Sequence, residues 1–243
     1  MDWFIWIAVF ATSALSGVFG MAGGMLLLLL LTARMPLADA MVLHGSAQLV
    51  ANGVRAALLA RHVRYDLVLR YVGAGVLAVA LCGAFGIVVD AAFALILTGL
   101  VGCAEPWFAR LRMPSIEQPH GVLTAGALVS ALHVTSGATG PVLDAFFARS
   151  SLARHQNVAT KALLQCSGHV LKIAYFVLLA GGGGKLDLAQ GFWLIALASV
   201  GGTMVGRKIL DRVDEAFFRR GTRILVRGLG AASLIRGAFA LAL

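Results

Sequence analysis

The chain has 243 residues, of which 60% are hydrophobic and 13% charged, and its formal net charge at pH 7 is +9. A soluble domain carries about 25% charged residues, so this composition predicts a protein that lies in a lipid bilayer. The basic excess does not require a nucleic-acid partner, because lysine and arginine commonly flank membrane helices on the cytoplasmic side. Cys82, Cys103 and Cys166 lie far apart in apolar stretches, which predicts neither a disulfide framework nor a metal site.

Eight apolar runs, separated by short charged loops, predict an all-α polytopic membrane protein. In chain order they cover residues 3–33, 40–60, 67–89, 91–108, 121–148, 158–180, 188–205 and 224–243. As straight helices, the first and fifth runs would exceed about 40 Å, against a hydrocarbon core of about 30 Å. Both contain backbone-breaking residues: Gly17, Gly20, Gly23 and Gly24 in the first, and Gly137, Gly140 and Pro141 in the fifth. Each of these two runs is therefore predicted to be two helical pieces joined by a break.

The loop charges indicate whether a broken run crosses the membrane or turns back. If all eight runs cross, the loop lysines and arginines divide nine against six between the two sides. If both broken runs fold back, thirteen lie on one side, and only Arg34 and Lys185 lie on the other. The positive-inside rule therefore favours two re-entrant hairpins over bent crossings. This topology places both termini outside the cytoplasm.

The two broken runs are also related in sequence. An offset of 117 residues aligns Ser13 with Ser130, Gly20 with Gly137, and Gly23 with Gly140. The next helix carries an aligned set of polar residues, in which His44, Gln48, Asn52 and Arg55 fall on Lys161, Gln165, His169 and Lys172. In both copies the spacing is i, i+4, i+8 and i+11, which lines one face of an α-helix.

This duplication predicts one membrane domain made of two repeats, residues 1–120 and 121–243. Each repeat would hold a glycine-broken hairpin and three transmembrane helices. Because three crossings is an odd number, the second repeat would be inserted upside down relative to the first. Inverted repeats whose broken helices meet near the midplane are a recurrent design of secondary transporters.

The glycine breaks are candidate binding elements. A helix that begins inside the membrane presents free N–H groups and the positive end of its dipole, and both attract an anion. The alternative is that these glycines only allow close packing of helices. With the polar faces of the following helices, the predicted substrate-binding residues are Gly20, Gly23, Gly24, His44, Gln48, Asn52, Thr135, Ser136, Gly137, Gly140, Lys161 and Gln165.

Other ionisable residues in the apolar runs are candidates for gating and for proton coupling. Arg55 and Lys172 would line a gate or path, or else extend to the lipid headgroups. The candidates for carrying a proton are His44, His133, Asp144 and His169. A buried histidine is more often a hydrogen-bonded structural residue, and Asp144 has Lys161 or Arg149 as its expected ion-pair partner.

Two stretches resemble the TauE/SafE transporter family. They are the glycine-rich residues 16–25, followed by Pro36 and a polar-faced helix, and residues 136–142 with a Gly-x-x-Gly-Pro turn. The resemblance implies a transporter for sulfite, sulfoacetate or related organosulfur anions in a bacterial inner membrane. The sequence departs from the family at Ala22, where a glycine triplet is usual, and at His44 and Lys161, near which small hydroxyl residues often stand.

Together these features predict a secondary transporter that moves a small anion by alternating access. A passive anion channel is the alternative. An enzyme is not expected, because the sequence lacks a His-Glu-x-x-His motif, paired intramembrane aspartates and a nucleophile elbow. We expect no cofactor, no metal and no nucleic-acid partner. The expected partners are the anion and the lipid bilayer, and a homodimer is left open.

Overall fold

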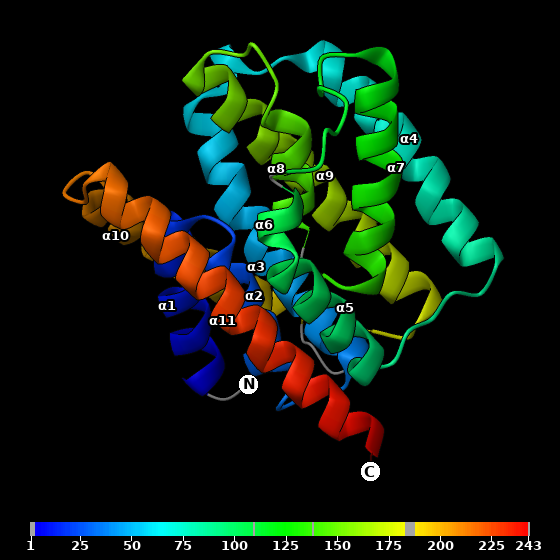
Figure 1. Ribbon diagram of the computed structural model, residues 1–243. Coiled ribbons are helices and arrows are strands. Elements are labelled where there is room, and N and C mark those ends of the chain that lie inside the picture. Colours follow the sequence, from blue (N-terminus) through cyan, green and yellow to red (C-terminus); the bar gives the residue numbers. More distant parts are fainter. Residues whose placement is uncertain (1–2, 109, 138, 183–187, 243) are drawn as a thin grey trace.

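A computed structural model describes residues 3–108, 110–137, 139–182 and 188–242, and in these segments every regular element is a helix (Figure 1). The predicted all-α fold is thus confirmed. The helices are α1 (Trp3–Phe19), α2 (Ala22–Leu31), α3 (Leu37–Leu58), the 3-10 turn η1 (Ala60–His62), α4 (Tyr65–Ala84), α5 (Ala91–Cys103), α6 (Glu105–Phe108), α7 (Pro119–Thr135), α8 (Gly140–Phe147), α9 (Arg154–Leu179), α10 (Leu188–Leu210) and α11 (Glu215–Ala242). Lys185, which entered the topology argument, lies outside the described residues.

Among the described residues, four helices are long and apolar enough to cross a membrane: α4, α9, the Gly191–Leu210 part of α10, and α11. The helix ends differ from the apolar runs in two places. The run 91–108 divides into α5 and α6, because Pro106 has no N–H with which to continue a helix and its ring would clash with the preceding turn. Conversely, α11 begins at Glu215, nine residues before its apolar run, and a 2.8 Å ion pair between Glu215 and Arg219 joins its first two turns.

The first glycine-broken run folds back on itself. Gly20 has φ = 66°, a left-handed conformation that favours glycine, and its N–H donates to the carbonyl of Ser16 at 2.9 Å. A Cβ atom on Gly23 would lie 2.0 Å from the carbonyl oxygen of Thr12, so α2 lies against the end of α1. Ile5 and Leu31 then belong to one buried cluster. α2 therefore runs back along α1 instead of continuing its direction.

The second broken run makes the same kind of turn. Gly137 also has a positive φ, 76°, and lies between α7 and α8. The N–H of Ile116, which precedes α7, donates to the carbonyl of Phe146 at the end of α8 at 2.9 Å. The end of α8 has thus returned to the start of α7, and the bent-crossing alternative does not describe either run.

The main helix pairs are α1 with α10, α4 with α7, α3 with α9, and α5 with α11, the last two helices running side by side in Figure 1. In chain order, the helices α1–α5 correspond to α7–α11. If each helix is exchanged for its counterpart, the pair α1 with α10 becomes α7 with α4, and the pairs α3 with α9 and α5 with α11 stay the same. Corresponding positions also meet. The Cys166 thiol points to the carbonyl of Leu49 at 3.7 Å, and these residues are 117 positions apart. Where α5 crosses α11, a Cβ on Gly102 would lie 2.9 Å from the Cα of Gly230.

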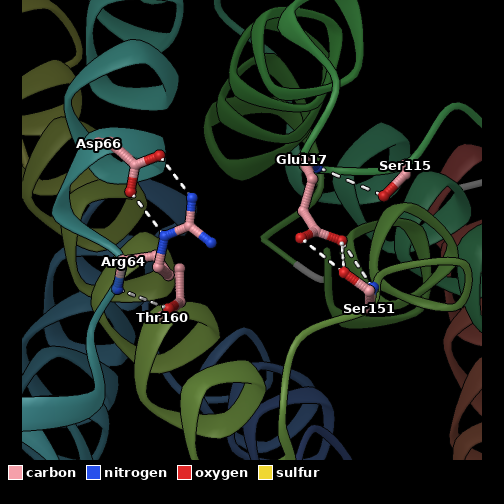
Figure 2. Close-up of polar contacts among 6 residues, drawn as sticks. All are labelled: Arg64, Asp66, Ser115, Glu117, Ser151 and Thr160. Carbon is pink, nitrogen blue, oxygen red and sulfur yellow. Dashed lines mark hydrogen bonds and ion pairs between the residues drawn. The ribbon is translucent and has the colours of Figure 1, made fainter.

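Polar contacts join the loops at the end of the bundle where α4 and α7 begin and α8 ends (Figure 2). We call this the arginine-rich end, because it carries Arg61, Arg64, Arg112 and Arg149. The backbone N–H of Arg64 donates to the hydroxyl of the buried Thr160 in α9 at 3.0 Å, and its guanidinium forms two hydrogen bonds with Asp66. In the same view, Glu117 accepts hydrogen bonds from the backbone N–H and the hydroxyl of Ser151, at 2.6 and 3.0 Å. These contacts fix the start of α4 to α9, and the loop before α7 to the loop after α8.

Candidate functional site

A cavity of about 410 Å³ lies where the two breaks and the two polar-faced helices meet. Its volume falls in the range of about 300–1,000 Å³ that is usual for small-ligand sites. Among the residues predicted to bind the substrate, to gate or to carry a proton, those that line it are Gly20, Gly24, His44, Gln48, Asn52, Arg55, His133, Gly137, Gly140, Asp144, Lys161, Gln165 and His169. The structure therefore brings together residues from both halves of the chain.

Four of the predicted residues lie elsewhere. Gly23 packs against α1, where its missing side chain lets the two helices touch. The hydroxyl groups of Thr135 and Ser136 donate to carbonyl groups one turn earlier in α7, at 2.9 and 3.0 Å. Lys172 is fully buried behind His44 and does not line the cavity.

The tips of the two hairpins form part of the cavity wall. α2 begins at Ala22 and α8 at Gly140, and Met21, Gly140 and Pro141 line the cavity beside these helix starts. The tips also touch, since a Cβ on Gly140 would lie 2.6 Å from the Cβ of Met21. A helix start carries free N–H groups and a partial positive charge of roughly half an elementary charge. Two such starts beside one cavity favour a negatively charged occupant.

Lys161 forms an ion pair across the cavity wall. Its ammonium lies 2.6 Å from a carboxylate oxygen of Asp144, and it also lies 5.4 Å from the ring centre of Phe147. Of the two partners expected for Asp144, Lys161 is the observed one. The Lys161 and Asp144 side chains keep 27% and 40% of their exposure, so the pair sits in the open part of the cavity.

Arg55 turns toward the protein interior. Its guanidinium donates to the side-chain oxygen of Asn52 at 3.1 Å and to the carbonyl of Ser16 at 3.4 Å. Asn52 in turn donates to the backbone carbonyl of Gln48 at 3.0 Å. Ser16 lies in the last turn of α1, where a cation interacts favourably with the negative end of the helix dipole. Arg55 thus places a fixed positive charge beside the first hairpin and does not extend to the headgroups.

The inner end of the cavity is formed by His44, His133 and His169, and Lys172 lies behind His44; we call these four residues the basic cluster. The Nζ atom of Lys172 lies 2.5 Å from Nδ1 of His44. The ring of His169 lies between the other two, with centroids 5.8 Å from His44 and 4.8 Å from His133. All four side chains are at least nine-tenths buried.

The cavity extends from the basic cluster to the start of α11. Beyond the basic cluster, toward the start of α3, the backbones pack closely, since a Cβ on Gly182 would lie 2.8 Å from the carbonyl oxygen of Ala38. At the other end the cavity is lined by Leu210 at the end of α10 and by Phe218 and Thr222 near the start of α11.

Sequence reasoning missed the residues that α11 contributes to the cavity. Phe218 and Thr222 lie before the apolar run 224–243 and were assigned to a loop. The i, i+4 spacing of Glu215 and Arg219 was the available signal that the helix starts earlier. Met21 and Ser16 were missed because neither residue type, taken alone, indicates a binding site.

The chain was also compared with known proteins. The family model described as sulfite exporter TauE/SafE matches residues 5–233. Neither a curated protein nor a solved structure matches the chain. Within the described part of the chain, no group of histidine, cysteine, aspartate and glutamate side chains is arranged to hold a metal ion.

Proposed function

Because the chain belongs to the sulfite exporter TauE/SafE family, we propose that it is a secondary transporter that carries a small sulfur-containing anion across the bacterial inner membrane. Membership of this family supports a membrane transporter over an enzyme. The observation that supports the anion, beyond the family, is the cavity between the two hairpin tips. The cavity is lined by residues at the starts of α2 and α8 and by the cations Arg55 and Lys161.

These groups suit a tetrahedral oxyanion. The helix starts and the lysine supply hydrogen-bond donors and positive charge, and charge-assisted hydrogen bonds are roughly twice as strong as neutral ones. The side-chain amides of Gln48 and Gln165 come from the two polar-faced helices and also line the cavity. Amide donors bind sulfonate or sulfite oxygens without adding further charge, so the anion is held but can still leave.

Alternating access follows from two inverted repeats, residues 1–120 and 121–243. The exchange of helix pairs between the halves, and the contact of Leu49 with Cys166, support this arrangement. We propose that the cavity opens at the arginine-rich end, where Leu210, Phe218 and Thr222 line it, and that this is one of the two states of such a transporter. With the arginine-rich end in the cytoplasm, the cavity faces inward and both termini lie in the periplasm.

Uptake into proteoliposomes tests the function. The panel consists of sulfite, thiosulfate, sulfoacetate, ethanesulfonate and simple carboxylates. We expect saturable uptake of at least one sulfur-containing anion, accelerated when the same unlabelled anion is present on the opposite side. A passive channel would show no such acceleration, and an absence of uptake for the whole panel would contradict the proposal.

A substitution in the cavity sharpens this test. Lys161→Gln removes a charge-assisted hydrogen bond of about 1.5–3 kcal/mol, so the apparent affinity should fall by at least about tenfold. Lys208→Gln is the matched control, because Lys208 is an exposed lysine in the last turn of α10 and does not line the cavity. Equal effects of the two substitutions would show that Lys161 has no special role.

A further inference from the structure

The hydrogen bonds of the basic cluster define where its protons lie. Nε2 of His44 faces the carbonyl of Gly24 at 3.0 Å, so this nitrogen carries the proton and Nδ1 accepts from Lys172. His133 has the opposite tautomer, because its Nδ1 faces the carbonyl of Val129 at 3.0 Å. Both rings are therefore neutral in this arrangement, and the charge of the cluster changes when Lys172 gains or loses a proton.

Lys172 has no counter-ion within the described part of the chain. Its hydrogen bond goes to His44 on α3, and the rings of His169 on α9 and His133 on α7 continue the cluster from there. Asp144, the acid of the cavity wall, is paired with Lys161. An unpaired charge in a protein interior costs several kcal/mol, so a positive charge on the cluster and an anion in the adjoining cavity stabilise each other.

The two repeats differ at this position. The offset of 117 places Lys172 on Arg55. Arginine keeps its proton at any pH a protein experiences, whereas a lysine amine can release it. The protein therefore has one permanent cation and one cation that can be discharged at corresponding places of its two polar-faced helices.

A proton has a path between the cavity and Lys172. His44 and His169 line the cavity, and His44 also contacts Lys172 directly. Nδ1 of His169 is buried and has no hydrogen-bond partner among the described residues, so it is free to accept a proton. The cluster also contacts both hairpins. His44 contacts the carbonyl of Gly24 in α2, and Nε2 of His133 lies 3.3 Å from the hydroxyl of Thr139, which precedes α8.

We propose that the basic cluster couples transport to protons, with Lys172 taking up one proton, by way of His169 and His44, for each anion that binds in the cavity. The protein is then a proton–anion symporter. This inference rests on the proposed transport function. By thermodynamic linkage, the anion raises the affinity of the cluster for the proton by the same factor as the proton raises the affinity of the cavity for the anion.

Ethanesulfonate is the suitable probe, because it carries no proton at neutral pH and so cannot itself move one. Proteoliposomes loaded with a pH-sensitive dye receive an inward gradient of ethanesulfonate. We expect the interior to become acidic with one proton per anion, and the uptake rate to be unaffected by an imposed potassium diffusion potential. Anion uptake without acidification would overturn the coupling and leave the transport function intact. If neither anion nor protons move, the proposed function fails, and the coupling with it.

Substitutions locate the coupling site. Lys172→Gln and Lys172→Arg should each lower the proton-to-anion ratio at least about tenfold, the first by removing the amine and the second by fixing its charge. Lys161→Gln, the same change on the same helix, should slow transport but keep a ratio of one. Size-exclusion chromatography in detergent identifies variants that fold. A folded Lys172 variant that retains the wild-type ratio would overturn the assignment, and the wild-type ratio itself tests the coupling if neither variant folds.

Discussion

Two neighbouring glycines allow the hairpin geometry to be tested by the same substitution at adjacent positions. A Cβ on Gly23 would lie 2.0 Å from the carbonyl oxygen of Thr12 and 2.6 Å from the backbone nitrogen of Ser16. Restoring an ordinary contact of 3.4 Å requires α1 and α2 to separate by about 1.4 Å. The nearest atom to a Cβ on Gly24 is instead in the flexible side chain of Gln48, at 3.4 Å, an ordinary contact.

The expected free energies follow from these contacts. Overpacking of this kind typically costs about 1–3 kcal/mol, so Gly23→Ala should lower the free energy of unfolding by about that amount. Alanine in place of a helical glycine gains about 0.5–1 kcal/mol, so Gly24→Ala should be neutral or slightly stabilising. In transport the effects should differ, because only the methyl group at Gly24 enters the cavity, where it should weaken anion affinity.

Unfolding in increasing mole fractions of sodium dodecyl sulfate, followed by circular dichroism, measures the stability of both variants. Uptake kinetics in proteoliposomes measure the affinity of Gly24→Ala. A Gly24→Ala variant as unstable as Gly23→Ala, or a Gly23→Ala variant as stable as the wild type, would refute the assignment of Gly23 to packing and Gly24 to the cavity.

Three further substitutions have defined outcomes. Asp144→Asn removes the negative charge beside Lys161, so the apparent anion affinity measured by uptake should rise about fivefold, from an electrostatic gain on the order of 1 kcal/mol; unchanged affinity would place the anion away from this pair. Thr160→Val leaves the backbone N–H of Arg64 without its partner and should lower the free energy of unfolding by about 1–3 kcal/mol. Arg236→Gln removes a guanidinium that binds the C-terminal end of α2, so its unfolding midpoint in detergent should fall, whereas an unchanged midpoint would show that α2 needs no such support.

The turn-back of both broken runs was predictable because it depends on local chemistry and on the sorting of loop charges. Glycine at the two breaks permits the positive φ angles that Gly20 and Gly137 adopt. Helical periodicity likewise predicted that Gln48 and Asn52 would share one face with His44, and the structure places all three along one cavity.

Other features depend on three-dimensional packing and were not predictable. Lys172 meets His44 across 128 residues of sequence, a contact that depends on how deeply α3 and α9 overlap. The hydroxyls of Thr135 and Ser136 were expected in the cavity, but short hydroxyl side chains readily bond to the preceding turn of their own helix. Phe218 reaches the cavity because α11 extends beyond its apolar run into residues whose charges suggested a loop.

The most direct test of anion binding between the hairpin tips is protection of a cysteine in the cavity. In a background without Cys82, Cys103 and Cys166, Gln165→Cys places a thiol on the cavity wall. A negatively charged methanethiosulfonate reagent should modify it from the cytoplasmic side, and a transported anion should slow that reaction at least about threefold. Ser151→Cys, in an exposed loop, is the control whose reaction should not change. Modification of Gln165→Cys at the same rate with and without the anion would contradict the proposed site.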